Sequence, residues 1–115
     1  MPVILKAPDG RSVRLSANVD TGASFCIFKR DYAEQLGLDV ETGVHKVVST
    51  ATGRLDVYGH TLTLSCLEWE FETMVYFAEP SDYRRDVLGR SGWLERFRLG
   101  LVEHDALLFL SGYDD

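Results

Sequence analysis

The stretch Asp20-Thr21-Gly22-Ala23-Ser24 occurs once in this chain of 115 residues, between two segments that predict β-strands. Before it, apolar and polar residues alternate from Val13 to Val19, which is the pattern of a strand with one buried face. After it, Phe25 to Phe28 is an uninterrupted apolar run of strand length. We therefore expect the Asp20 stretch to form a tight reversal between two strands.

The rest of the chain also favours β-structure. A strand from Val3 to Ala7 is expected to join the strand at Val13 through the turn Pro8-Asp9-Gly10. A short helix is expected from Arg30 to Leu36, with Gly37 placed to end it. Further strands are expected over Val44 to Ser49, Leu55 to Cys66 and Phe71 to Ala78.

The C-terminal part predicts a little helix and then one more hairpin. Ser91 to Phe97 suits one or two helical turns, and Arg98 to Val102 pairs with Ala106 to Leu110 around Glu103-His104-Asp105. No internal repeat or linker interrupts the chain, so we expect one domain over residues 1–115.

Composition excludes several classes of function. Twelve Lys and Arg against eighteen Asp and Glu give a net charge of -6, which argues against a nucleic-acid partner. No apolar run approaches the roughly 20 residues that span a bilayer, and the N-terminus lacks the pattern of a signal peptide, so a cytoplasmic protein without a membrane partner is expected. Cys26 and Cys66 are isolated, and the three His are scattered without ligand spacing. We expect buried, reduced thiols, no metal site and no cofactor.

The chemistry that an Asp-Thr-Gly turn suggests needs a second carboxylate. Water attacks a peptide bond when one carboxylate takes its proton and another, protonated, polarises the carbonyl group. The motif occurs once, so Asp20 would have to meet the same residue of a second copy. If this chain is a protease, it should be a homodimer that cleaves peptide or protein substrates.

Three elements follow one another in an informative order: the Asp20 motif, a hairpin around Thr52-Gly53, and Val87-Leu88-Gly89-Arg90. This order resembles that of the retropepsin family, the single-lobe aspartic proteases, over almost the whole chain. The resemblance implies an all-β fold, a retropepsin-like closed β-barrel with one or two short helices. It also implies an aspartic endopeptidase.

The resemblance assigns a role to each motif. The catalytic stretch would be Asp20, Thr21 and Gly22, with Thr21 bracing the paired loops across the two-fold axis. Substrate would contact Ala23 and Ser24 and the tip of a flap hairpin that closes over the peptide, formed by Ala51, Thr52 and Gly53. An apolar segment behind the catalytic loop would contain Leu88 and Gly89, followed by Arg90, which would buttress the dimer.

Some positions depart from the retroviral members of the family. Ser24 and the helix from Arg30 to Leu36 are typical of cellular and bacterial members instead. The segment Ser91-Gly92-Trp93-Leu94 differs from the usual continuation after the arginine, and the flap tip has a single glycine.

Other interpretations remain open from the sequence. Asp20-Thr21-Gly22 is also a common kind of turn between strands, as is Glu41-Thr42-Gly43, which we interpret as a surface turn. The alternative function is a catalytically inactive peptide-binding or dimerisation module that keeps the fold. A structural β protein with an accidental motif is the third possibility.

The final hairpin is expected to supply most of the dimer interface, because Arg98 to Leu110 is long enough to form a complete hairpin. Deletion of the chain from Arg98 onward should therefore abolish dimerisation, as measured by sedimentation. A stable dimer of the truncated chain would count against this role.

Overall fold

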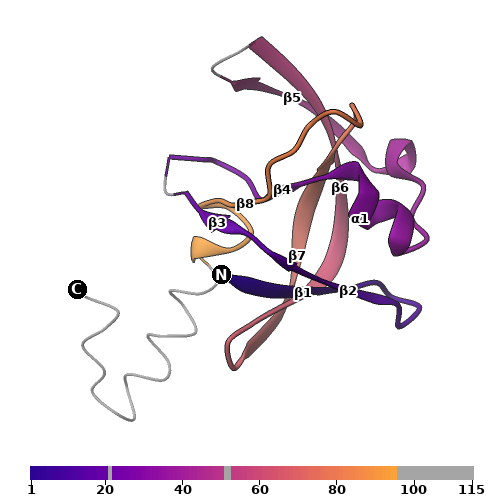
Figure 1. Cartoon of the computed structure of the whole chain (residues 1–115), viewed down its shortest axis with the longest axis vertical. Helices are drawn as coiled ribbons and strands as arrows, with labels where there is room; N and C mark the ends of the chain where they lie inside the picture. Colours follow the sequence, from indigo (N-terminus) through magenta and orange to yellow (C-terminus); the bar gives the residue numbers. More distant parts are fainter. Residues whose placement is uncertain (21, 51–52, 96–115) are drawn as a thin grey trace.

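The computed structural model describes residues 1–20, 22–50 and 53–95, and its secondary structure is mostly β (Figure 1). The strands are β1 Pro2–Lys6, β2 Ser12–Ser16, β3 Asn18–Val19, β4 Ile27–Phe28, β5 Val44–Thr50, β6 Gly53–Cys66, β7 Trp69–Ala78 and β8 Val87–Leu88. The helices are α1 Arg30–Gln35 and a 3-10 helix, η1, at Val40–Thr42. The predicted fold class, mostly β with a short helix, is confirmed.

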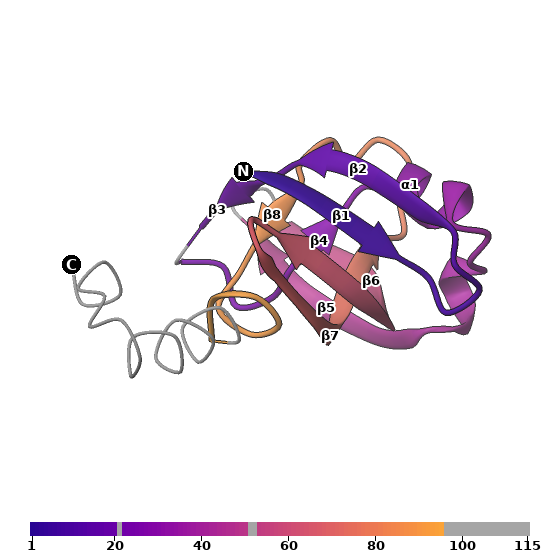
Figure 2. The same cartoon turned by 90° about the horizontal axis from the view of Figure 1, so that it is seen from below.

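The strands form one sheet in the order β2-β1-β6-β7-β4-β8-β3, and β5 pairs with β6 off this path. Only Ala17 separates β2 from β3, so the path begins and ends on the same segment of chain. In Figure 2 the β1–β2 hairpin lies above the β6–β7 hairpin, and the sheet curves from one to the other. The sheet therefore wraps around a common interior.

The long β6 strand belongs to two hairpins. Its second half pairs with β7 in an antiparallel ladder that runs from Val57 opposite Ala78 to Cys66 opposite Trp69. Its first half pairs with β5, from Val44 opposite Gly59 to Thr50 opposite Gly53. One continuous strand thus joins the interior to the predicted flap hairpin.

The segment between β2 and β4 changes partners around Asp20. The predicted strand from Val13 to Val19 is broken at Ala17, whose N–H donates to the Met1 carbonyl, and Asn18 N–H donates to the Asp86 carbonyl instead. β3 then runs parallel to β8, while β4 pairs with β8 antiparallel. The two strands that flank Asp20 therefore lie on either side of β8.

Other boundaries shift for similar local reasons. The run from Phe25 to Phe28 keeps only Ile27–Phe28 as a strand, because Phe25 makes a single bridge with Ser91. The helix ends at Gln35, and Gly37 follows at φ +74°, the left-handed conformation expected for its stop. The turn predicted at Glu41-Thr42-Gly43 overlaps the 3-10 helix η1 at Val40–Thr42. The predicted final hairpin lies outside the described residues, and so does the end of the helix predicted over Ser91 to Phe97.

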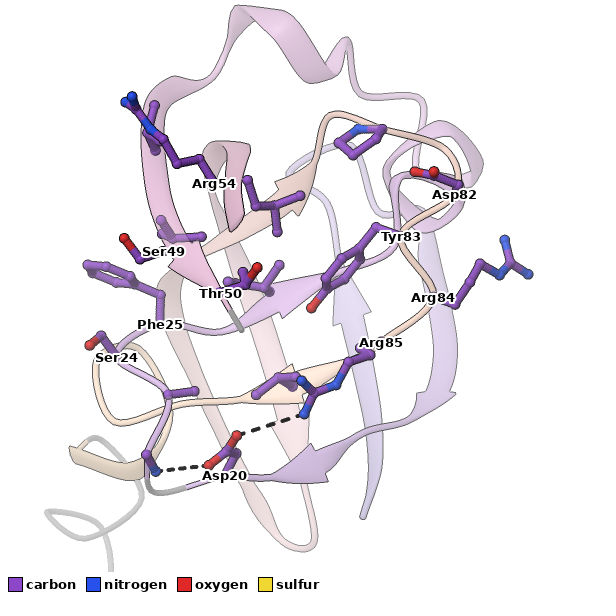
Figure 3. Close-up of a pocket in the computed structure, with 18 residues that line it drawn as sticks. Asp20, Ser24, Phe25, Ser49, Thr50, Arg54, Asp82, Tyr83, Arg84 and Arg85 are labelled. Carbon is purple, nitrogen blue, oxygen red and sulfur yellow. Dashed lines mark hydrogen bonds and ion pairs between the residues drawn. The ribbon is translucent and has the colours of Figure 1, made fainter. Parts of the chain in front are cut away.

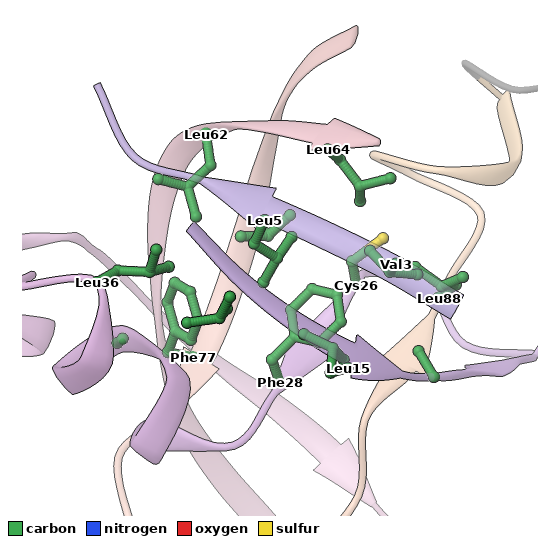
Figure 4. Packing of buried hydrophobic residues seen from close by; sticks show 14 of the residues in the cluster. Val3, Leu5, Leu15, Cys26, Phe28, Leu36, Leu62, Leu64, Phe77 and Leu88 are labelled. Carbon is green, nitrogen blue, oxygen red and sulfur yellow. The ribbon is translucent and has the colours of Figure 1, made fainter. Parts of the chain in front are cut away.

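The interior is filled by apolar side chains from nearly every element, as Figure 4 shows. Phe28 and Phe77 are fully buried at its centre, and Leu36 covers one end. Other members are Val3, Leu5, Leu15, Cys26, Leu62, Leu64 and Leu88. A second, smaller cluster of Ile27, Leu55, Val57, Tyr76 and Ala78 lies at the base of the β5–β6 hairpin. Burial of both clusters fixes that hairpin relative to the loop at Asp20.

No helix within residues 1–20, 22–50 and 53–95 has the length and apolar character needed to cross a bilayer. Across the same residues, no cluster of three His, Cys, Asp or Glu side chains is arranged as metal ligands.

Both cysteines are buried free thiols, as the sequence predicted. Burial raises the pKa of Cys26 from 9.0 to about 11, although a backbone hydrogen bond from Gly89 opposes the shift. Burial also raises the pKa of the Cys66 thiol, and the Trp93 side chain opposes this shift.

The raised pKa of Cys26 predicts a loss of stability in alkali. Between pH 9 and 11 the unfolded thiol is ionised while the folded one keeps its proton, so the free energy of unfolding falls as pH rises. The full loss for Cys26 should be about 2–3 kcal/mol. Urea denaturation across this range should show it in the natural chain. When each protein is referred to its own stability at pH 8, the Cys26→Ala variant should lose about 2–3 kcal/mol less than the natural chain does. Equal losses in the two proteins would show that the Cys26 thiol does not cause the alkaline loss of stability.

Candidate active site

Backbone hydrogen bonds hold the Asp20 carboxylate in place. Asp20 N–H donates to the Leu88 carbonyl at 3.0 Å, Gly22 N–H donates to Asp20 Oδ1 at 2.9 Å, and Ala23 N–H donates to the Asp20 carbonyl at 3.1 Å. The Asp20 side chain keeps 42% of its surface exposed. The Gly22 N–H therefore orients the carboxylate through Oδ1, while Oδ2 faces Arg85 and accepts no hydrogen bond from the described residues.

The second half of the loop is bound to the segment after β8. Arg90 N–H donates to the Ala23 carbonyl at 3.0 Å, and Ser91 N–H donates to the Ser24 carbonyl at 2.8 Å. A Cβ on Gly89 would come within 2.6 Å of the Phe25 carbonyl carbon, so only glycine allows the two backbones to pack this closely.

A cleft of about 810 Å³ opens above the loop, as Figure 3 shows. One wall is the β5–β6 hairpin, with Val47 to Thr50, Arg54 and Leu55. The opposite wall is a loop from Pro80 to Arg85 that leads into β8. The remaining lining residues are Asp20, Gly22, Ala23, Ser24, Phe25, Ile27 and Val87.

The structure brings most of the predicted site residues together. Asp20, Gly22, Ala23 and Ser24 line the cleft, and Leu88 and Gly89 lie buried behind the loop. Gly53 begins β6 at φ +131° at the flap tip but is not among the lining residues. Thr21, Ala51 and Thr52 lie outside the described residues. The roles given to these residues stay predictions.

The role of Arg90 as a buttress of the dimer stays a prediction. Its side chain is exposed, and its Nη2 lies 3.5 Å from Ser24 Oγ. Within one chain, the backbone of Arg90 holds the loop, and its guanidinium group remains available to another partner.

Sequence reasoning missed two residues that precede β8. Arg85 places Nη2 3.9 Å from Asp20 Oδ2, and the Tyr83 ring projects into the cleft from the same loop (Figure 3). Desolvation raises the pKa of Tyr83, while the positive charge of Arg85 opposes that shift. The only sequence signal for a role of Arg85 was its place in a pair of arginines, Arg84 and Arg85, shortly before an apolar segment in an acidic chain.

Asp86 was also missed, and it ties β8 to α1. Its Oδ1 accepts the Lys29 backbone N–H at 3.0 Å, its Oδ2 lies 3.6 Å from Lys29 Nζ, and its side chain is only 8% exposed. Its backbone carbonyl accepts the Asn18 N–H at 2.9 Å. This one residue therefore fixes the starts of β3, α1 and β8.

Replacement of Asp86 by Ala should destabilise the fold by about 2–3 kcal/mol. The Lys29 backbone N–H loses its acceptor, and the largely buried ammonium group of Lys29 loses its ionic partner. The matched control is Asp31→Ala, which removes an exposed carboxylate 3.9 Å from Arg84 and should cost less than about 1 kcal/mol. Urea denaturation measures both. Similar losses in the two variants would show that burial of Asp86 contributes nothing.

The chain and its fold are similar to known proteases. The family model described as aspartyl protease matches residues 9–91. Among solved structures, a retropepsin-like aspartic protease from Rickettsia conorii is 26% identical with a TM-score of 0.60, covering 83% of this chain and 86% of its own. The EIAV protease, solved with an inhibitor, is 16% identical with a TM-score of 0.60, covering 87% of this chain and 86% of its own.

A comparison with curated proteins finds no match. The family model covers well over half of the 115 residues, and each of the two structures aligns with more than four fifths of this chain. The chain therefore belongs to the aspartyl protease family, and its fold is retropepsin-like.

Proposed function

We propose that this chain is an aspartic endopeptidase that works as a homodimer, with one Asp20 from each copy. The observation that carries the proposal is the Asp20 carboxylate itself, which accepts the Gly22 N–H, belongs to a side chain that is 42% exposed, and lines a cleft of about 810 Å³. Among the described residues, the only other carboxylate lining the cleft is Asp82, at the far end of the Pro80 to Arg85 loop (Figure 3). We therefore infer that the second carboxylate beside Asp20 comes from another copy.

Two Asp20 carboxylates about 3 Å apart could not both be ionised, so the pair would hold one shared proton. The ionised carboxylate takes a proton from water, and the protonated one donates to the carbonyl oxygen of the substrate. The water oxygen bonds to the carbonyl carbon and forms a tetrahedral intermediate. Its C–N bond then breaks as the first carboxyl group gives its proton to the leaving nitrogen and the second takes a proton from a hydroxyl group of the intermediate. Peptide hydrolysis then proceeds without a covalent intermediate.

The β5–β6 hairpin supports an extended peptide as the substrate. In the described part of the chain, β5 pairs with β6 alone, and its residues Val47 to Thr50 line the cleft. A strand with one unpaired edge can bind an extended peptide by backbone hydrogen bonds. We infer that substrate lies between this strand and the Asp20 loop.

A mixing experiment tests whether each site needs two Asp20 residues. Asp20→Asn chains added to an equal amount of natural chain should lower its peptidase activity to about half after subunit exchange, because mixed dimers would be inactive. A larger excess of the variant should lower it further. Peptide cleavage is measured by mass spectrometry, and sedimentation measures dimer formation.

The control is Asp39→Asn, which removes an exposed carboxylate outside the cleft and should leave activity unchanged when mixed. Undiminished activity in the presence of excess Asp20→Asn would mean that each chain acts alone. Activity of the pure Asp20→Asn protein would remove Asp20 from the mechanism. A dimer that binds peptide but never cleaves it would favour the inactive binding module.

A further inference from the structure

Within the part of the chain that the structure describes, the Arg85 guanidinium group is ion-paired with the Asp20 carboxylate and donates no hydrogen bond. The pair is joined at 3.9 Å, which is close enough for ionic attraction but too long for a hydrogen bond. The Arg85 side chain is 66% exposed and points across the cleft floor (Figure 3). A guanidinium group carries five N–H donors in a planar fork, so it can bind a further carboxylate at this point.

The charge of the cleft differs in sign from that of the chain. Among the described residues, its lining contains three arginines, Arg54, Arg84 and Arg85, against Asp20 and Asp82, whereas the whole chain has a net charge of -6. Figure 3 shows that the Arg54 and Arg84 side chains point away from Asp20, and Arg84 lies 3.9 Å from Asp31. The positive charge on the cleft floor therefore comes from Arg85.

The proposed dimer would leave part of this charge without a partner. A pair of Asp20 carboxylates that shares one proton carries a single negative charge. Two Arg85 side chains carry two positive charges, so the paired site has an excess of one. This excess would lie within reach of the substrate residues that flank the cleaved bond, because Asp20 is the group that contacts that bond.

We propose that Arg85 makes this site select peptides with an acidic side chain next to the cleaved bond. The inference rests on the proposed function, since it names a substrate class for the same site. The substrate carboxylate accepts hydrogen bonds from the Arg85 fork, in the geometry that gives the strongest charge-assisted pairs. Val87 and Ile27, which line the cleft beside it, are suited to contact the methylene groups of a Glu side chain.

The anchoring of the neighbouring residue supports a selective role. Arg85 directly precedes Asp86, whose carboxylate and carbonyl bind Lys29 and Asn18. The backbone that carries Arg85 is therefore fixed on one side, while its exposed side chain remains free to turn from Asp20 to a substrate carboxylate. Such a rigid base lowers the entropy cost of pairing with substrate.

The test uses three peptides of one sequence that differ only beside the cleaved bond, with Glu, Gln or Lys. The natural chain should cleave the Glu peptide with a kcat/KM roughly five- to tenfold above that for Gln, and Lys should be poorest. Arg85→Gln should abolish the Glu preference, Arg85→Glu should favour Lys, and Arg85→Lys should keep a weaker preference for Glu. High salt should reduce the preference.

The matched control is Arg11→Gln, which removes an arginine of similar exposure that lies 3.4 Å from Asp9 outside the cleft, and it should keep the full Glu preference. The proposal is overturned if the natural chain cleaves the Glu and Gln peptides with equal kcat/KM. It is equally overturned if Arg85→Gln changes cleavage of the Glu and Gln peptides by the same factor, because Arg85 would then act only on Asp20.

A binding measurement separates this inference from the proposed function. Fluorescence anisotropy of the same labelled peptides on full-length Asp20→Asn protein needs no catalysis. The Asp20→Asn protein should bind the Glu peptide more tightly than the Gln peptide, and the double variant that also carries Arg85→Gln should lose this difference. That result supports selection by Arg85 even if the natural chain cleaves nothing. Equal binding of Glu and Gln peptides overturns it even if the natural chain is an active protease.

Discussion

The hydrogen bonds of β8 hold the rest of this structure together around Asp20. β8 is only Val87–Leu88, yet it pairs with β3 on one side and β4 on the other. The Leu88 carbonyl accepts the Asp20 N–H, and the residues after it bind Ala23 and Ser24. A buried two-residue strand with backbone partners on both sides has little freedom to move, so the loop between β3 and β4 is equally restrained.

Two neighbouring charged residues just before β8 have opposite environments, and one has a structural role while the other is available for function. Asp86 is buried and paired with Lys29, where the low dielectric makes its loss costly. Arg85, one residue earlier, is exposed and reaches Asp20 across the cleft, where the pair contributes little to stability. Because Arg85 is exposed, it remains available for substrate, while the buried Asp86 beside it fixes the backbone that carries Arg85.

Sequence patterns predicted the long strands and the helix well. The β6–β7 hairpin and the end of α1 before Gly37 follow from alternation and from a glycine stop, which are local properties. Family resemblance also singled out the Asp20 loop and the segment at Leu88. The break at Ala17 and the shortening of β4 were missed, because both arise when distant segments compete for the same backbone donors.

The sequence by itself determined a single Asp-Thr-Gly turn between two strands, a mostly β chain, and two buried thiols, since each depends on neighbouring residues or on overall composition. The tertiary structure alone decided that Arg85 meets Asp20 and that Asp86 is buried against Lys29. Both contacts join residues far apart in the chain. They form because β8 inserts between β3 and β4, and no local pattern specifies which side chains such a pairing brings together.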